Sequence, residues 1–218
     1  MGILDALNLQ RLRRQISKKR LPMSDFKSSK TFQNLINAFA GESQARNRYT
    51  FFASEAKKAG YNQISRIFLE TADNEKEHAK IYYKHIVENL GDDVPNEITV
   101  TGTYPVELAD TARNLLSAAL GEEDEVVDYS ASAQVAEEEG YKAVARSFRA
   151  IAAVETHHAQ RYRTLLANVE NDSVFTKEEP TQWICWNCGY IHTGAKAPEL
   201  CPACLHPKAY FEVLCETY

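Results

Sequence analysis

The chain has 218 residues, enough for one sizeable domain and a small one, with a core large enough to enclose a buried polar site. Its net charge of −5, with both signs interspersed, gives no electrostatic basis for binding nucleic acid. No stretch approaches the roughly 18 apolar residues that cross a bilayer, and the N-terminus lacks a secretory signal, so we expect a cytoplasmic protein with no membrane partner.

The beginning of the chain differs in composition from the rest. Residues 1–22 carry six Lys and Arg residues against a single acid, Asp5, with apolar residues at loose helical spacing. This pattern fits an organellar transit peptide, an amphipathic surface helix, or an upstream start before Met23. We assign residues 1–26 to an N-terminal extension of unknown role, and organellar targeting stays open as an alternative location.

Four segments have apolar residues at helical spacing and end near Gly60, Gly91, Gly140 and Asn168. We expect helices over residues 31–60, 61–90, 106–139 and 141–168. The stretch 91–105 contains two prolines and two glycines and predicts a long connection between two helical hairpins. Such a crossover is typical of ferritin-like bundles. The sequence therefore predicts a mainly α protein with a ferritin-like four-helix bundle over residues 27–171.

Two pairs of cysteines follow the bundle. Residues 172–181 are polar and charged and predict a linker, and residues 182–218 predict a small domain with turns and short strands. In that domain Cys185-x-x-Cys188 and Cys201-x-x-Cys204 are separated by twelve residues, which indicates one tetrahedral site with four thiolate ligands. The spacing does not choose between a structural zinc and a one-electron iron centre. We expect Cys215 to remain a thiol that only packs.

A Glu…Glu-x-x-His pattern occurs twice in the bundle. Residues three apart lie on one face of a helix, so each Glu-x-x-His pair can bind one metal ion. The first copy is Glu42, Glu75 and His78, and the second lies 80 positions later at Glu122, Glu155 and His158. One such set could be no more than charged residues on exposed helix faces. Two sets in register predict a carboxylate-bridged di-iron or di-manganese site.

Three further residues are candidates for catalysis. Glu125 has no acidic counterpart in the first copy, where Ala45 stands, so it could make the two metals inequivalent. Tyr49 and Tyr129 lie two turns beyond Glu42 and Glu122, so their hydroxyls could bond ligand carboxylates or supply protons. The alternative is that both are core tyrosines whose hydroxyls merely find a partner.

Several stretches resemble the rubrerythrin family, from about Lys27 to the C-terminus. The stretches that carry the resemblance are Ala40–Tyr49, Asn74–Ala79, Cys185–Tyr190, Ala197–Cys204 and His206–Phe211. The resemblance implies a non-haem di-iron centre and one iron in a rubredoxin-like site. It assigns Glu42, Glu75, His78, Glu122, Glu125, Glu155 and His158 to the iron pair, and Cys185, Cys188, Cys201 and Cys204 to the single iron.

The same resemblance implies an oxidoreductase of oxidative stress defence. It would reduce hydrogen peroxide to water, with electrons delivered through the four-cysteine iron from a redox donor protein, either rubredoxin or a pyridine-nucleotide-dependent reductase. The resemblance also implies that one iron shifts between Glu125 and His78, and that the chain forms a head-to-tail homodimer or a higher oligomer. The alternatives are a ferritin-like ferroxidase that handles iron, and a zinc ribbon on an inert helical scaffold.

Overall fold

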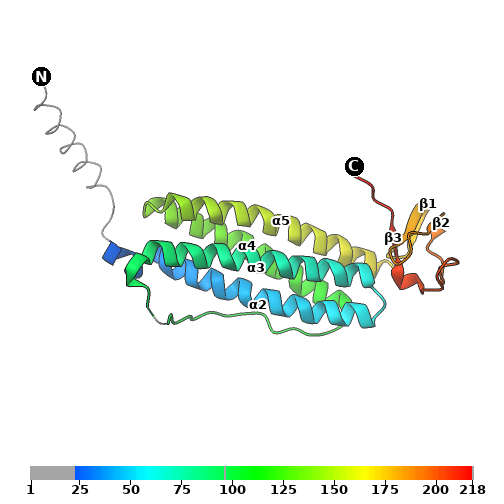
Figure 1. The fold of residues 1–218 in the computed structure, drawn as a ribbon, viewed down its shortest axis with the longest axis horizontal. Helices are drawn as coiled ribbons and strands as arrows, with labels where there is room; N and C mark the ends of the chain where they lie inside the picture. Colours follow the sequence, from blue (N-terminus) through cyan, green and yellow to red (C-terminus); the bar gives the residue numbers. More distant parts are fainter. Residues whose placement is uncertain (1–22, 96, 218) are drawn as a thin grey trace, which may run out of the picture.

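The computed structural model describes residues 23–95 and 97–217. Four long helices lie side by side in an elongated bundle, and a small module with three strands sits at one end (Figure 1). The helices are α2 (Lys30–Lys58), α3 (Asn62–Leu90), α4 (Thr111–Glu138) and α5 (Lys142–Glu170). The mainly α four-helix bundle predicted from the sequence is confirmed. No helix in the described ranges is long and apolar enough to span a membrane.

Each hairpin is closed by a glycine with positive φ. Gly60 (φ 85°) joins α2 to α3, and Gly140 (φ 89°) joins α4 to α5. A residue with a side chain is strained in this conformation, which explains why glycine stands at both positions. The connection from α3 to α4 begins with the short helix η2 (Gly91–Asp93) and runs along the bundle, so α2 lies beside α4 (Figure 1).

The third helix begins later than predicted. We expected it from residue 106, but α4 starts at Thr111. The carboxylate of Asp110 accepts a hydrogen bond from the backbone N–H of Arg113 at 2.9 Å and caps the helix. The side chain of Asn114 bonds both backbone groups of Ala109, which holds the preceding residues outside the helix. Val106 is fully exposed, so burial of its side chain does not favour extending the helix back to residue 106.

Two aromatic clusters form the core of the bundle. One contains Tyr49, Phe68 and Tyr162, and the other contains Tyr129, Phe148 and Tyr82. Each residue of the first cluster is related to one of the second by the 80-residue repeat. Burying each of these rings contributes about 1.5–3 kcal/mol. The two repeats therefore contribute equivalent halves of the core. The glutamates and histidines of the repeated pattern lie between these two halves.

Equivalent tyrosines at the two hairpin turns hold the segments that flank the bundle. Tyr61 stacks on Phe175 with ring centroids 6.2 Å apart, and Tyr141 contacts Phe26 edge to face at 5.1 Å. Phe26 belongs to the 3-10 helix η1 (Met23–Ser28) and is 1% exposed. The predicted extension 1–26 is therefore wrong at its end, because Phe26 packs into the bundle core. The interpretations of residues 1–22 lie outside the described residues.

The small module is an antiparallel sheet with the strand order β2-β1-β3. Its elements are β1 (Thr176–Cys185), β2 (Ile191–Lys196), η3 (Lys208–Tyr210) and β3 (Phe211–Val213). Strand β1 begins inside the stretch that we expected to be a linker, 172–181. Thr176 already pairs with Lys196, and the pairing then shifts register before Thr181. Pro180 occupies this irregular stretch, where the missing N–H of a proline is tolerated.

Contacts from Arg66 join the module to the end of the bundle. The guanidinium of Arg66 pairs with the carboxylate of Glu212 and lies 5.2 Å from the ring centroid of Trp186. Trp186 in turn stacks on Tyr210 at 4.9 Å. The module is thus placed at the turn between α2 and α3, away from the middle of the helices (Figure 1).

Candidate metal centres

The six residues of the duplicated pattern meet in the middle of the bundle. Each of the four helices supplies one glutamate, and α3 and α5 each add a histidine one turn later. They form two groups whose ligand atoms lie within 4.8 Å of one another. The His78 group is Glu42, Glu75, His78 and Glu155, and the His158 group is Glu75, Glu122, Glu155 and His158. Glu75 and Glu155 belong to both groups, as bridging ligands of a metal pair would.

The ligand atoms of both groups lie close together but do not form hydrogen bonds with one another. The Nδ1 atom of His78 lies 2.9 Å from an oxygen of Glu75 and 2.9 Å from one of Glu155. The Nδ1 atom of His158 lies 2.8 Å from Glu155 and 3.6 Å from Glu122. Neither Nδ1 atom, and neither oxygen of Glu75 or Glu155, has a partner in hydrogen-bond geometry among the described residues.

The four glutamates of the two groups are each 0% exposed: Glu42, Glu75, Glu122 and Glu155. Burying several carboxylates together is very unfavourable unless a cation is shared between them. The set of oxygen ligands with one imidazole per metal therefore fits two iron or manganese ions.

Burial and like charge set the pKa values of the ligands in the metal-free protein. Burial raises the pKa of Glu122 to about 8, and burial together with the charge of Glu125 raises the pKa of Glu42. Burial lowers the pKa of His78, but the neighbouring carboxylates Glu155 and Glu75 outweigh it and raise the value to about 9. Protons therefore occupy the site at neutral pH when metal is absent, and metal ions must displace them.

Both predicted tyrosines contact ligands, each in the opposite repeat. The Tyr49 hydroxyl donates a hydrogen bond of 2.6 Å to Oε1 of Glu122, and the Tyr129 hydroxyl donates one of 2.8 Å to Oε1 of Glu42. The two bonds are equivalent under the 80-residue repeat. Each tyrosine therefore orients the one glutamate of a metal group that is not shared with the other group.

Glu125 lies outside both metal groups. It lines a cavity of about 610 Å³ between α2, α4 and the residues Gly102–Pro105 of the crossover, together with Tyr129 and Arg48. Burial and the charge of Glu122 raise its pKa, while Arg48 acts in the opposite direction. The seventh ligand expected from the sequence is therefore close enough to the site to feel its charges, but His78, not Glu125, completes the group.

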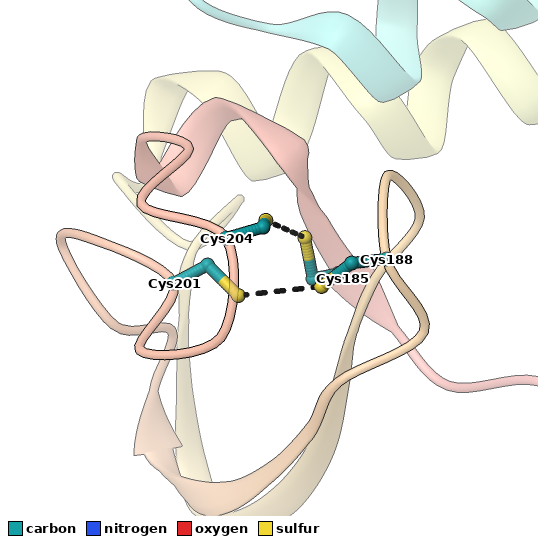
Figure 2. A group of neighbouring side chains, drawn as sticks. All are labelled: Cys185, Cys188, Cys201 and Cys204. Atoms are coloured by element: carbon teal, nitrogen blue, oxygen red, sulfur yellow. Dashed lines mark hydrogen bonds between the residues drawn. The ribbon is translucent and has the colours of Figure 1, made fainter.

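The four cysteines come together as one cluster in the small module. Figure 2 shows their sulfur atoms facing one another from two turns, with Cys185 3.8 Å from Cys204 and Cys188 3.6 Å from Cys201. A tetrahedral ion with bonds of about 2.3 Å to sulfur would separate its ligands by about 3.8 Å, so the cluster fits such an ion. The backbone N–H of His206 lowers the pKa of the Cys204 thiol to about 6.

Aromatic side chains cover the cysteine cluster. Trp183 and Phe211 are buried beside Cys185 and Cys201, with Tyr190 and Tyr210 packed against them. Cys215 lies apart from the cluster and is exposed, so the expectation that it packs is wrong. It follows β3, beyond the end of the sheet, where no core remains to cover it.

One residue with a bearing on the site went unnoticed in the sequence. Asn74 places its Oδ1 atom 3.3 Å from Nε2 of His158. The only signal was its position next to Glu75, and that does not reveal a contact to another helix. Two other histidines of the bundle lie outside the ligand groups: His85 bonds Ser147, and His157 is exposed.

Comparison with known proteins gives matches over nearly the whole chain. The family model described as rubrerythrin matches residues 33–166 and 113–182, and the model of its rubredoxin-like domain matches residues 183–212. Rubrerythrin-1 of Clostridium acetobutylicum is 54% identical over 90% of this chain and 100% of its own length. The rubrerythrin of Nitratidesulfovibrio vulgaris is 47% identical over 88% of this chain and 98% of its own.

Solved structures agree with the architecture. The structure of fully reduced, all-ferrous nigerythrin is 33% identical, covers 85% of this chain and 90% of its own, and superposes with a TM-score of 0.57. A bacterioferritin of Desulfovibrio desulfuricans covers 71% of this chain and 87% of its own, with a TM-score of 0.62 at 22% identity. This second likeness supports the ferritin-like fold and nothing further.

Proposed function

The chain belongs to the rubrerythrin family, and on that premise we propose that it is a peroxidase that reduces hydrogen peroxide to water. The observation that carries the proposal is the pair of buried metal groups that share Glu75 and Glu155, in a chain that also holds a four-cysteine cluster. The two groups are the di-iron site and the cysteines are the rubredoxin-like iron site. A redox centre attached to an iron pair is expected where the pair must be re-reduced after each turnover.

Reduction of hydrogen peroxide to two waters takes two electrons and two protons. When bound, the iron pair supplies both electrons together. The chain's own residues must bind the peroxide and provide protons at the leaving oxygen. Glu125 suits the second task, because burial raises its pKa and its Oε2 atom has no hydrogen-bond partner among the described residues. The cavity that Glu125 lines gives a small polar substrate a route toward the metal groups.

We further propose that Glu125 and His78 alternate in the ligand set. The support is that His78 lies inside the metal group while Glu125 lies outside it with an unpaired buried oxygen. Tyr49 and Tyr129 would hold Glu122 and Glu42 in place during such an exchange, because their hydroxyls bond carboxylates that are not exchanged. Their second role would be to donate a proton through these bonds.

The electron supply favours more than one copy of the chain. Glu42 lies sixteen residues (58 − 42) before the end of α2 at Lys58, near the turn where the cysteine module sits, and this amounts to about 24 Å along the axis. We propose that the module of a second copy lies closer, in a head-to-tail homodimer or a larger homo-oligomer. A redox donor protein, rubredoxin or a pyridine-nucleotide-dependent reductase, would reduce the cysteine iron.

We also propose a cytoplasmic role in oxidative stress defence. All five cysteines are free thiols, four of them placed as metal ligands, and a reducing compartment keeps thiols in that state.

The deciding experiment follows the colour of the cysteine iron. The full-length protein, with iron at both sites, would be reduced without oxygen and then mixed with one equivalent of hydrogen peroxide or with dissolved oxygen. We expect the thiolate-to-iron absorption to bleach on reduction and to return much faster with peroxide. Variant Cys201→Ser, which removes one cysteine ligand, is the control and should consume the equivalent of peroxide without the return of the thiolate-to-iron absorption.

Other outcomes would support other functions. Faster reoxidation by oxygen than by peroxide would favour a ferroxidase that handles iron. Failure of the reduced, iron-loaded protein to consume peroxide would rule out the peroxidase.

A further inference from the structure

Each metal group has one glutamate that it does not share with the other group, and each of these two glutamates accepts a hydrogen bond from a tyrosine. Glu122 receives a hydrogen bond from Tyr49, and Glu42 receives one from Tyr129. The two tyrosines occupy equivalent positions in the repeat, 80 residues apart. These two hydrogen bonds therefore do not distinguish the groups, and the repeat is broken instead at Glu125, where Ala45 stands in the first copy, and at the partners of the two histidines.

The histidines are the ligands whose support differs. Nε2 of His158 lies 3.3 Å from Oδ1 of Asn74, which stands on α3 one position before Glu75. An amide oxygen can only accept a hydrogen bond, so Nε2 of His158 donates, and its Nδ1 atom is the one that faces the carboxylates. A partner at the far nitrogen is the usual way in which a metal-binding histidine is oriented.

His78 lacks the equivalent partner. The residue 80 positions after Asn74 is Val154, whose side chain has no hydrogen-bonding atom. Within the described part of the chain, the polar groups that contact His78 are the carboxylates on its Nδ1 side. Its ring also stacks on the ring of His158, with the centroids 6.1 Å apart. The His78 side chain is 12% exposed, against 2% for His158. Among the described residues, no side chain holds the far nitrogen of His78 as Asn74 holds that of His158.

From this break in the repeat we propose that Asn74 is a positioning residue that fixes the ring of His158, so that the His158 group retains its metal longer than the His78 group. A ring held in place before metal binds loses less rotational freedom on binding. Loss of such a partner typically costs a factor of about 10–100 in metal affinity. The inference concerns metal retention and does not depend on the peroxidase proposal, so each can fail without the other.

Release of Mn(II) tests the inference on the full-length protein. Manganese suits the carboxylate site and binds thiolates weakly, so the cysteine cluster contributes little. Protein loaded with Mn(II) would be mixed with excess EDTA, and the released ion followed by electron paramagnetic resonance. We expect a fast and a slow phase in the unchanged protein. Asn74→Val should accelerate the slow phase about 10–100-fold.

Two matched variants identify the cause. Val154→Asn gives His78 the amide that its repeat counterpart has, and it should slow the fast phase. Asn74→Asp keeps an acceptor of the same shape and should leave the slow phase slow. Valine is compatible with a helix at this position of the repeat, because Val154 occupies the equivalent position in α5. Asn74→Val is therefore expected to fold. A slow phase that is unchanged in Asn74→Val, or accelerated equally in Asn74→Asp, would overturn the proposal.

Hydrogen exchange of the imidazole protons gives a second readout. In zinc-loaded protein with labelled histidine, the Nε2–H proton of His158 should exchange slowly with water and that of His78 rapidly. Asn74→Val should make exchange at His158 fast and leave His78 unchanged, whereas Val154→Asn should slow exchange at His78. A residue that only stabilised the fold would not move these two signals separately. Equal exchange at both histidines in the unchanged protein would contradict the inference.

Discussion

The hydroxyl of Tyr49 in α2 donates a 2.6 Å hydrogen bond to Glu122 in α4, and the equivalent Tyr129 in α4 donates one of 2.8 Å to Glu42 in α2. The two bonds cross between the repeats in opposite directions. Each repeat therefore orients a metal ligand of the other, and neither hairpin contains a complete site. The two hairpins must pack together before either metal group has its full support.

Replacement of either tyrosine should weaken one metal group more than the other. A hydrogen bond to a charged group contributes about 1.5–3 kcal/mol, equivalent to roughly 10–100-fold in affinity. Tyr49→Phe should weaken Mn(II) binding in the His158 group, and Tyr129→Phe in the His78 group, as measured by calorimetric titration of metal-free protein. The control is Tyr83→Phe on the outer face of α3, where the ring is 51% exposed. Two binding steps with unchanged affinities in both variants would contradict this assignment.

The ligands of the metal pair could be predicted because helix geometry is regular. A Glu-x-x-His spacing puts both side chains on one face whatever the surroundings, and its repetition 80 positions later identifies that face as buried. The four cysteines could be predicted for a similar reason, since each Cys-x-x-Cys turn chelates locally. In both cases the chemistry follows from residues that are near neighbours in the chain.

Contacts between helices could not be predicted in the same way. The bond between Asn74 and His158 joins residues 84 positions apart, and it depends on the register of α3 against α5. The start of α4 depends on the side chains of Asp110 and Asn114, which compete with an apolar pattern that continues further back. The start of strand β1 was placed too late because the pairing of Thr176 with Lys196 overrides the polar character of the residues that follow.

Metal uptake should become stronger as pH rises. The metal-free protein holds protons on Glu122, with a pKa of about 8, and on His78, with a pKa of about 9, and only the deprotonated groups bind metal. Both pKa values are raised, so the protons compete with metal below them and the competition disappears as pH passes through them. We expect the affinity for Mn(II) to increase steadily from pH 6 to 8.5, with protons released on binding. Affinity that is flat or falls over this range would contradict the prediction.

Glu139 should stabilise the bundle through the start of α2. Its carboxylate accepts hydrogen bonds from the backbone N–H groups of Lys30 and Thr31 and from the Thr31 hydroxyl, at 3.1, 2.9 and 2.6 Å. Burial raises the pKa of Glu139, but the bonds to Thr31 outweigh it and the net pKa is lowered. A lowered pKa means that the stabilisation is present above the ordinary pKa of glutamate and is lost as pH falls through the folded-state value.

Variant Glu139→Gln should lose about 1 kcal/mol of unfolding free energy near pH 7, since it removes the charge at a helix N-terminus. The difference from the unchanged protein should shrink toward zero under strongly acidic conditions, where the carboxylate is protonated. Urea denaturation of metal-free protein measures both values without interference from metal release. Glu138→Gln is the control, because Glu138 is exposed and accepts a bond only from the neighbouring Gln134 side chain within the described residues. An equal loss at neutral and acidic pH would show that the charge is not responsible.

Arg66 should hold the cysteine module against the end of its own bundle. It pairs with Glu212 and lies over the Trp186 ring, and both partners belong to the module. An exposed cation–π contact contributes about 0.5–1 kcal/mol and a surface ion pair about 0.2–1 kcal/mol. Arg66→Ala should therefore accelerate amide hydrogen exchange in residues 208–213 about tenfold, because 1.4 kcal/mol corresponds to a factor of ten.

The repeat provides a matched control for this prediction. Arg146 stands 80 positions after Arg66 at the opposite hairpin turn, where η1 and not the module packs on the bundle. Arg146→Ala should leave exchange in residues 208–213 unchanged, although it alters the same position of the same helical pattern. If both variants raised exchange in the module equally, Arg66 would act through general stability of the helices. If neither did, the aromatic contact of Tyr61 with Phe175 would be sufficient to hold the module.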